Sequence, residues 1–241
     1  MNITKESNIG ELVAQDYRTA SVFKQNGIDF CCNGNRTIQE ACDKSKIESE
    51  DLIAQLGASA YQTNGSSVNY NAWPLDLLAD YIEKTHHRYV TAKIEEILPF
   101  LEKIVNVHGK NHPELAEIKQ LFVDSAGELT SHMKKEELVL FPYIRKMEQT
   151  KQSVASLHPP FGTVQNPIRM MMHEHDNEGE RFRKIAALSN DYTPPEDACN
   201  TYKVTFALLK EFEDDLHLHI HLENNILFPK SIALEEHLLT L

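Results

Sequence analysis

The sequence lacks the features that mark membrane, secreted and nucleic-acid-binding proteins. No apolar run reaches the roughly 18 residues that a membrane-spanning helix needs. The N-terminal stretch Met-Asn-Ile-Thr-Lys-Glu-Ser has no apolar core of a signal peptide, so we expect a cytoplasmic protein with no membrane partner. Basic residues are also scarce, since 24 Lys and Arg stand against 36 Asp and Glu, a formal net charge of -12. This charge argues against nucleic acid and anionic lipid as partners.

Cysteine and glycine are scarce too. The four cysteines, Cys31, Cys32, Cys42 and Cys199, are too few for a disulfide framework in 241 residues, and a reducing compartment suits them. There are nine glycines and few alternating β-branched stretches, which favours helices over sheets. We therefore expect an all-α protein.

Two stretches repeat one pattern, H-x3-E-x3-L-F-P, at residues 132–142 and 219–229. Positions i and i+4 share a face of a helix, so His132 pairs with Glu136 and His219 with Glu223. A single H-x3-E is usually a solvated ion pair. Its repetition inside an apolar frame instead indicates two half-sites that face each other in a helical bundle, as in a carboxylate-bridged dinuclear metal centre.

The chain divides into three predicted parts. Residues 1–57 carry apolar side chains at helical spacing, with a helix start at Thr37 that has Glu40 three residues on, and predict a small helical domain. Residues 58–72 are rich in Ser and Asn, with one Gly, and predict a flexible linker. Residues 73–241 contain four long helical patterns, which predict an antiparallel four-helix bundle.

The adjacent Cys31 and Cys32 are the unusual chemistry of the N-terminal part. Buried cysteines commonly serve as small hydrophobic core residues. Two neighbouring thiols at a helix-entry turn can also form a redox pair or contact a soft metal. Their spacing leaves both interpretations open.

Helix rise sorts the histidines by height in the bundle. His87 and His132 each lie about 20 residues from the turn near residue 110, roughly 30 Å along their helices, and are therefore level. Neighbours on a helix point about 100° apart, so we expect one of His86 and His87 to face the core, and the apolar residues favour His87. Between His173 and His175, periodicity leaves the choice open.

The donor types indicate the metal. Imidazole is a ligand of iron or zinc, and carboxylates make the set of ligands harder. Four histidines with two glutamates therefore favour two irons over a structural zinc ion. Each glutamate would bridge both metals through its two oxygens.

Several motifs together resemble the repair-of-iron-centres family, and the match covers nearly the whole chain. Asp29-Phe30-Cys31-Cys32-Asn33-Gly34 is similar to the N-terminal Cys-Cys-x-Gly motif of that family. Three further motifs resemble its metal-binding motifs: His132-x3-Glu136, Glu174-His175-Asp176 and His219-x3-Glu223-Asn224-Asn225. The resemblance implies a hemerythrin-like bundle with an oxo- and carboxylate-bridged pair of Fe ions. Its implied terminal ligands are His87, His132, His175 and His219, and its implied bridges are Glu136 and Glu223.

The resemblance also implies a function. Members are cytoplasmic stress-response proteins, often homodimers, that restore iron–sulfur clusters damaged by nitric oxide or peroxide, and iron supply is the expected means. We expect a non-enzymatic iron donor whose Cys31 and Cys32 help transfer iron or dock damaged iron–sulfur proteins. The alternatives are a hemerythrin-like module that binds or senses O2 or NO, and a di-iron enzyme that reduces NO. The cysteine domain favours repair, because a simple O2 carrier does not need it, and no electron-transfer cofactor motif supports the enzyme.

Overall fold

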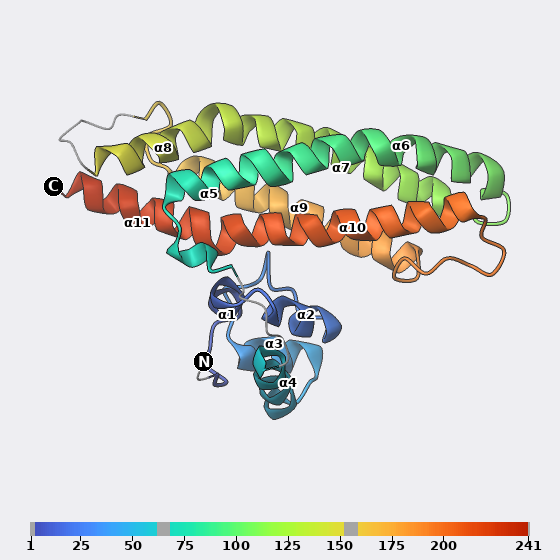
Figure 1. Ribbon diagram of the computed structural model, residues 1–241, viewed down its shortest axis with the longest axis horizontal. Coiled ribbons are helices and arrows are strands. Elements are labelled where there is room, and N and C mark those ends of the chain that lie inside the picture. Colours follow the sequence, from blue (N-terminus) through green and yellow to red (C-terminus); the bar gives the residue numbers. More distant parts are fainter. Residues whose placement is uncertain (1–2, 62–67, 152–158, 241) are drawn as a thin grey trace. The chain divides into compact units, whose positions relative to one another are not determined.

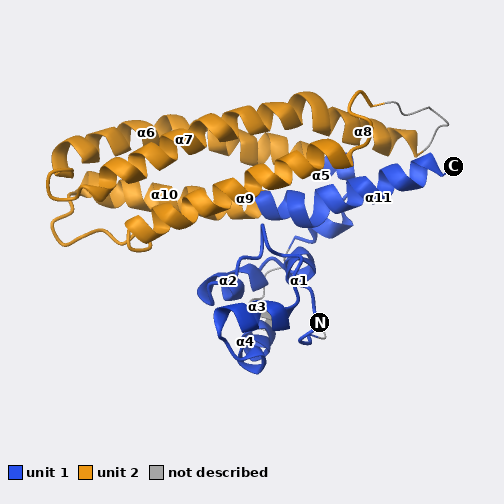
Figure 2. Ribbon diagram, turned by 180° about the vertical axis from the view of Figure 1, so that it is seen from behind, with its two compact units in different colours: residues 1–78, 220–241 blue, residues 79–219 orange. Residues whose placement is uncertain are grey.

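The computed structural model describes residues 3–61, 68–151 and 159–240 (Figure 1). The chain divides into two compact units, residues 1–78 with 220–241, and residues 79–219 (Figure 2). Throughout the described residues the regular elements are helices, and the one extended pairing is an isolated bridge between Asn8 and Thr37. The all-α prediction is therefore confirmed.

The N-terminal part of the first unit contains four short helices, α1 (Ile9–Gln15), α2 (Thr19–Gln25), α3 (Ile38–Ser45) and α4 (Ser49–Tyr61). The predicted helix start at Thr37 is confirmed. The Thr37 hydroxyl accepts from the Glu40 N–H, and the Glu40 carboxylate accepts from the Thr37 N–H, so both orphan donors are satisfied. These helices enclose a small apolar core formed by Ile9, Leu12, Phe23, Ile38, Leu52 and Leu56.

The segment predicted as a linker, 58–72, is only partly described. Helix α4 runs into it as far as Tyr61, a 3-10 turn η1 covers Tyr70–Ala72, and residues 62–67 lie outside the described residues. The predicted domain boundaries at 57 and 73 stay a prediction.

The rest of the chain forms the helices of a four-helix bundle. In chain order the elements are α5 (Leu75–Tyr81), η2 (Ile82–His87), α6 (Arg88–His108), α7 (Glu114–Lys135), η3 (Glu136–Leu140), α8 (Phe141–Thr150), α9 (Gln165–Leu188), α10 (Asn200–Leu222), η4 (Glu223–Leu227) and α11 (Phe228–Leu239). Within the second unit, α6, α7, α9 and α10 lie side by side along one axis (Figure 1), and α7 packs against both α6 and α9. The predicted bundle is confirmed.

Three aromatic rings fill the bundle core between α7, α9 and α10. The Phe212 ring meets Phe122 edge-on with 5.2 Å between centroids and stacks on Phe182 at 5.6 Å. All three side chains are fully buried, and burial of each stabilises the fold by about 1.5 to 3 kcal/mol. This cluster fixes the relative positions of three of the four helices that carry the candidate ligands.

Among the described residues, no helix combines the length and apolar character that crossing a membrane requires.

Candidate metal centre

Three π-helical segments interrupt the long helices, and each contains one of the predicted ligands. His87 is the last residue of η2, Glu136 is the first of η3, and Glu223 is the first of η4. In η3 and η4 the turn is widened, because the Phe141 N–H donates to the Glu136 carbonyl and the Phe228 N–H to the Glu223 carbonyl. Such wide turns occur frequently at functional sites.

The repeated L-F-P supplies the cause of two of these segments. A proline has no N–H and its ring crowds the carbonyl four residues earlier, so it disfavours a regular α-helical turn. For Pro142 that carbonyl belongs to Leu138, inside η3, and for Pro229 it belongs to Asn225, inside η4. The wide turn accommodates the proline within a continuous helix and sets the rotation of the glutamate at its start.

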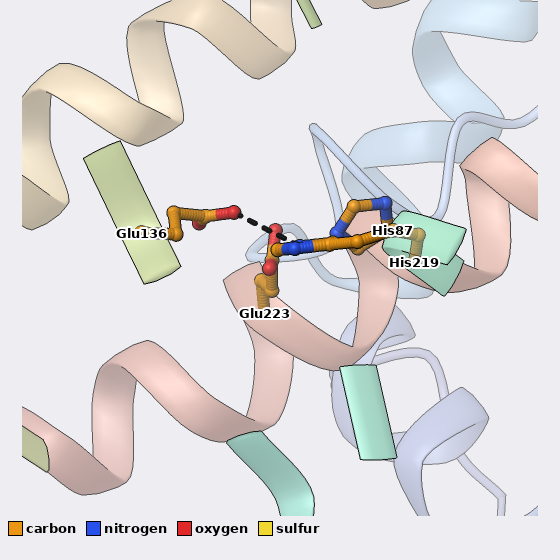
Figure 3. A group of neighbouring side chains, drawn as sticks. All are labelled: His87, Glu136, His219 and Glu223. Carbon is orange, nitrogen blue, oxygen red and sulfur yellow. Dashed lines mark ion pairs between the residues drawn. The ribbon is translucent and has the colours of Figure 1, made fainter. Parts of the chain in front are cut away.

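All six residues predicted as ligands are buried, and the structure brings them together. Their donor atoms form two groups, each within 4.8 Å: His87, Glu136, His219 and Glu223, and His132, Glu136, His175 and Glu223. The boundary between the two units falls inside α10, which continues directly into η4, so helix geometry places Glu223 one turn beyond His219. Figure 3 shows the first group, with its side chains pointing toward one another.

Glu136 lies between the two groups. Its Oε2 atom is 3.3 Å from His87 Nε2 and 3.3 Å from His132 Nε2, although these imidazoles belong to different groups. One carboxylate that reaches both groups is the arrangement of a bridging ligand. In the second group His132 Nε2 and His175 Nε2 are 3.1 Å apart, so both are directed at the same place.

The outer nitrogens of two histidines are held by carboxylates. His87 Nδ1 lies 2.8 Å from Glu137 Oε1, and His132 Nδ1 lies 2.8 Å from Glu174 Oε2. The His132 hydrogen bond lowers the pKa of Glu174 to about 2, against the opposing effect of partial burial, and Lys135 adds to the lowering. A carboxylate on Nδ1 fixes the ring orientation and directs Nε2 inward, which is the usual support of a metal-bound imidazole.

This donor set fits a pair of transition-metal ions. Each group offers two imidazole nitrogens and two carboxylates that both groups share, and the outer carboxylates orient the imidazoles. Imidazole with carboxylate is a donor set that iron accepts.

The expectation that only one of His86 and His87 would face the core was wrong, because both side chains are buried. His86 Nδ1 lies 2.9 Å from Asp215 Oδ1, and its ring stacks on His219 with 5.5 Å between centroids. Both histidines lie in η2, whose π-helical turn has more residues than an α-helical turn and so brings neighbours closer in direction. His86 belongs to neither donor group and supports His219 from the side. On α9, His173 is exposed and His175 is buried, so the choice that periodicity left open falls on His175.

A pocket of about 190 Å³ lies between α7 and α9. Its lining includes the exposed Glu128, the ion pair of Lys135 with Glu174, and the buried His132 and His175. The pocket connects the surface of this unit to two candidate ligands.

The two predicted thiols lie in the first unit, on the loop between α2 and α3. Cys31 is buried, Cys32 is half-buried, and their Sγ atoms are 3.8 Å apart. Asp29 Oδ1 accepts from the N–H groups of Cys31 and Cys32 and lies 3.4 Å from Cys31 Sγ. The contact with Cys32, together with burial, raises the pKa of the Cys31 thiol well above its usual value. Asp29, Cys31 and Cys32 together could hold a cation.

Sequence reasoning assigned no role to the supporting residues, although Glu174, Asn224 and Asn225 stand in motifs that resemble metal-binding motifs of the family. Glu137 and Glu174 each stand directly beside a predicted ligand, and an acidic neighbour of a ligand is the signal that could have indicated them. Asn224 and Asn225 follow Glu223 and carried no predicted role. Both hydrogen-bond to the cysteine loop.

A helical bundle with paired His and Glu donors at one level defines a hemerythrin-type cation-binding protein. Consistently, a family model described as the hemerythrin HHE cation binding domain matches residues 78–231, and the model of ScdA_N, a domain of unknown function, matches residues 5–60. The chain therefore belongs to the hemerythrin-like repair-of-iron-centres family, as the resemblance of its motifs indicated.

Relatives with an assigned name align along almost their whole lengths. The iron-sulfur cluster repair protein ScdA of Staphylococcus haemolyticus is 30% identical, over 95% of this chain and 99% of its own. The iron-sulfur cluster repair proteins YtfE of Musicola paradisiaca and of Yersinia pestis are each 34% identical, over 95% of this chain and 97% of their own.

Proposed function

We propose that the chain holds two iron ions and repairs damaged iron–sulfur clusters by donating iron. The observation that carries the proposal is the sharing of Glu136 and Glu223 by both donor groups. Two separate single-metal sites would not need common carboxylates. Two bridging carboxylates with four imidazoles are also more donors than one four-coordinate ion takes.

Each side chain has a defined part in this proposal. His87 and His219 hold one ion, His132 and His175 hold the other, and Glu136 and Glu223 bridge them. Glu137 and Glu174 keep two of the imidazoles in the orientation that directs Nε2 at the centre. When bound, the two iron ions would supply exchangeable iron and open coordination positions.

The repair function is supported by the relatives, which are named iron–sulfur cluster repair proteins. Each of them aligns with nearly the whole length of this chain. The partners of this chain are then iron–sulfur proteins damaged by nitrosative or oxidative stress, met in the cytoplasm, and the protein acts as a donor rather than as an enzyme. A homodimer remains a further prediction, which sedimentation velocity tests.

Cys31 and Cys32 are the proposed site of transient iron binding during transfer from the centre to the damaged protein. Their thiols and the Asp29 carboxylate form a donor group of softer character than the His and Glu centre. Metal binding displaces the thiol protons, so the loop can take up a cation although the Cys31 pKa is raised.

A second candidate function rests on the pocket beside His132 and His175. A pocket that leads from the surface to two candidate ligands suits entry of a small diatomic molecule, so O2 or NO binding, NO sensing or NO reduction at the centre is the alternative.

The deciding experiment mixes 57Fe-loaded protein with a [4Fe–4S] enzyme that nitric oxide has inactivated. We expect enzyme activity to return in step with transfer of 57Fe from this chain to the enzyme. Metal-free protein and Glu136→Leu protein are the controls. Recovery of activity while the 57Fe stays on this chain would overturn donation and favour NO removal at the centre.

A further inference from the structure

The Asn225 side chain is enclosed by the backbone of the N-terminal helical part. Its Nδ2 atom lies 3.1 Å from the Phe30 carbonyl and 3.4 Å from the Cys31 carbonyl. It is also 2.9 Å from His221 Nδ1, one turn earlier on the same helix. Asn224 Nδ2 donates to the Cys31 carbonyl as well, at 3.3 Å. Two successive side-chain amides of η4 therefore hold the two carbonyls at the start of the Cys31–Cys32 loop.

Two glycines make room for this contact. A Cβ atom at Gly10 would lie 2.5 Å from Asn225 Oδ1 and 2.8 Å from Asn225 Cγ, and one at Gly34 would lie 2.8 Å from Asn225 Oδ1. Neither glycine has a positive φ, so the requirement is for space and not for backbone conformation. The Gly10 N–H also donates to the Gly34 carbonyl at 2.7 Å, which joins α1 to the cysteine loop around the amide.

Two aromatic rings pack against His221, the residue that Asn225 contacts one turn earlier on the same helix. Tyr17 and Phe30 each place a ring centroid 6.0 Å from that of His221. His221 is buried. The cysteine loop is thus fixed to this segment of helix by hydrogen bonds, by close backbone approach and by aromatic packing.

The helix that holds the loop also carries a candidate iron ligand. Asn225 comes two residues after Glu223 in η4, and residues two apart on a helix point in nearly opposite directions. Glu223 is directed at the donor groups, while Asn225 is directed at the loop. The wide turn that sets the Glu223 side chain therefore also sets the amide that holds the thiols.

We propose that Asn225 is a positioning residue that keeps Cys31 and Cys32 docked beside the Glu223 turn, where they receive iron released from the centre. The docking stands on the contacts of Asn225 alone, whereas the role in transfer rests on the proposed function. Asn225 exchanges no metal itself and acts through the loop that it holds.

The test replaces Asn225 by Asp in the full-length, iron-loaded chain. The aspartate has the same size and fits between the glycines, but it has no N–H to offer the Phe30 and Cys31 carbonyls. We expect alkylation of Cys32 by iodoacetamide, followed peptide by peptide, to accelerate at least about tenfold, the factor that one or two lost hydrogen bonds supply. Bound iron should stay unchanged. Asn106→Asp, on the exposed face of α6, is the matched control.

A second pair of variants guards against a simple folding defect. In Gly10→Ala the added methyl group would clash with the Asn225 side chain, so this variant should also raise the rate of Cys32 alkylation. Removing the amide removes the two closest contacts of the added methyl group and leaves the Gly34 carbonyl at 3.1 Å. Gly10→Ala combined with Asn225→Ala should therefore be little more reactive than Asn225→Ala alone. Additive increases in the double variant, or unchanged alkylation in Asn225→Asp, would overturn the docking role.

Transfer is then measured with the same proteins. Asn225→Asp should deliver 57Fe to the damaged enzyme several-fold more slowly than the original chain while it binds as much iron. Equal transfer rates would overturn the positioning role in delivery. If the original chain itself delivers no iron, the proposed function fails and the delivery role fails with it, whereas alkylation still decides the docking.

Discussion

His175 Nε2 lies 3.1 Å from His132 Nε2, although the two imidazoles come from α9 and α7. Two imidazoles this close, with their inner nitrogens turned to each other, have a common target. The ring orientation of His132 is fixed at its outer nitrogen, because Nδ1 is hydrogen-bonded to Glu174. The same arrangement occurs at His87 with Glu137, so the centre is built from oriented rings and shared carboxylates.

Loss of a bridging glutamate should be more harmful than loss of a histidine. Glu136→Leu or Glu223→Leu removes a donor from both groups at once, so we expect nearly complete loss of iron. His87→Ala removes a donor from one group, and water can replace it, so at least about half the iron should remain. Iron per chain, with the magnetic coupling of the pair, measures the ranking. Glu117→Gln, on the surface of α7, is the control, and equal loss in all variants would show that the bridging roles are wrongly assigned.

The carboxylate behind His132 should tune iron affinity. Glu174→Gln keeps the shape of the side chain but removes the charge that holds His132 Nδ1, so iron should bind about 10- to 100-fold more weakly. Competition with a coloured chelator measures the change. Glu180→Gln, at an exposed position six residues further along α9, should leave affinity as it is. An unchanged affinity in Glu174→Gln would mean that packing alone orients His132.

The repeated proline should hold the wide turn that places Glu136. In Pro142→Ala the N–H returns, and a regular α-helical turn becomes available to the Leu138 carbonyl. We expect the variant to be equally or more stable, since alanine is about 3 kcal/mol more favourable than proline in a helix interior. Iron retention should fall about tenfold, because Glu136 rotates relative to α8. Thermal unfolding by circular dichroism and iron analysis on the same sample separate the two effects.

Much of this candidate centre could be predicted from the sequence because its candidate ligands repeat. His132 with Glu136 and His219 with Glu223 have helical spacing inside an apolar frame, so the pattern indicates both the helices and the direction of the side chains. The bundle follows from four such patterns. His175 needed the resemblance to a family, because periodicity does not separate it from His173, whose side chain is exposed.

The remainder depends on geometry that a regular helix does not have. Neighbours on an α-helix differ by about 100° in direction, so the sequence favoured one buried histidine, whereas the π-helical turn of η2 brings the directions of His86 and His87 closer together. Glu137 resembles an ordinary surface charge until the fold brings it to His87. The Phe30 carbonyl that Asn225 contacts is 195 residues away in sequence, so no local pattern indicates it.

Cys199 should be the most reactive thiol near neutral pH. It lies at the start of α10, where the Tyr202 N–H and then His108, whose Nε2 is 3.2 Å from the sulfur, lower its pKa to about 7. The thiolate forms above the pKa, so alkylation should reach half its maximal rate near pH 7. His108→Phe should move this midpoint upward. Cys42 is the internal comparison, since burial raises its pKa. Alkylation rates of each cysteine-containing peptide, measured as a function of pH, test this order of thiol reactivity. A midpoint for Cys199 at or above that of an ordinary thiol would contradict it.

The thiols of the N-terminal loop should matter for delivery and not for iron binding. Cys31→Ser combined with Cys32→Ser keeps the size of both side chains and leaves the six ligands of the centre untouched, so bound iron and thermal stability should change little. Serine hydroxyls are poor ligands for a soft transfer site, so delivery of 57Fe to a damaged [4Fe–4S] enzyme should slow at least about tenfold. Cys42→Ser, a buried thiol outside the loop, controls for loss of a core sulfur. If the double variant delivers iron at the full rate while Cys42→Ser also does, the two cysteines serve packing, and iron leaves the centre by a route that does not involve them.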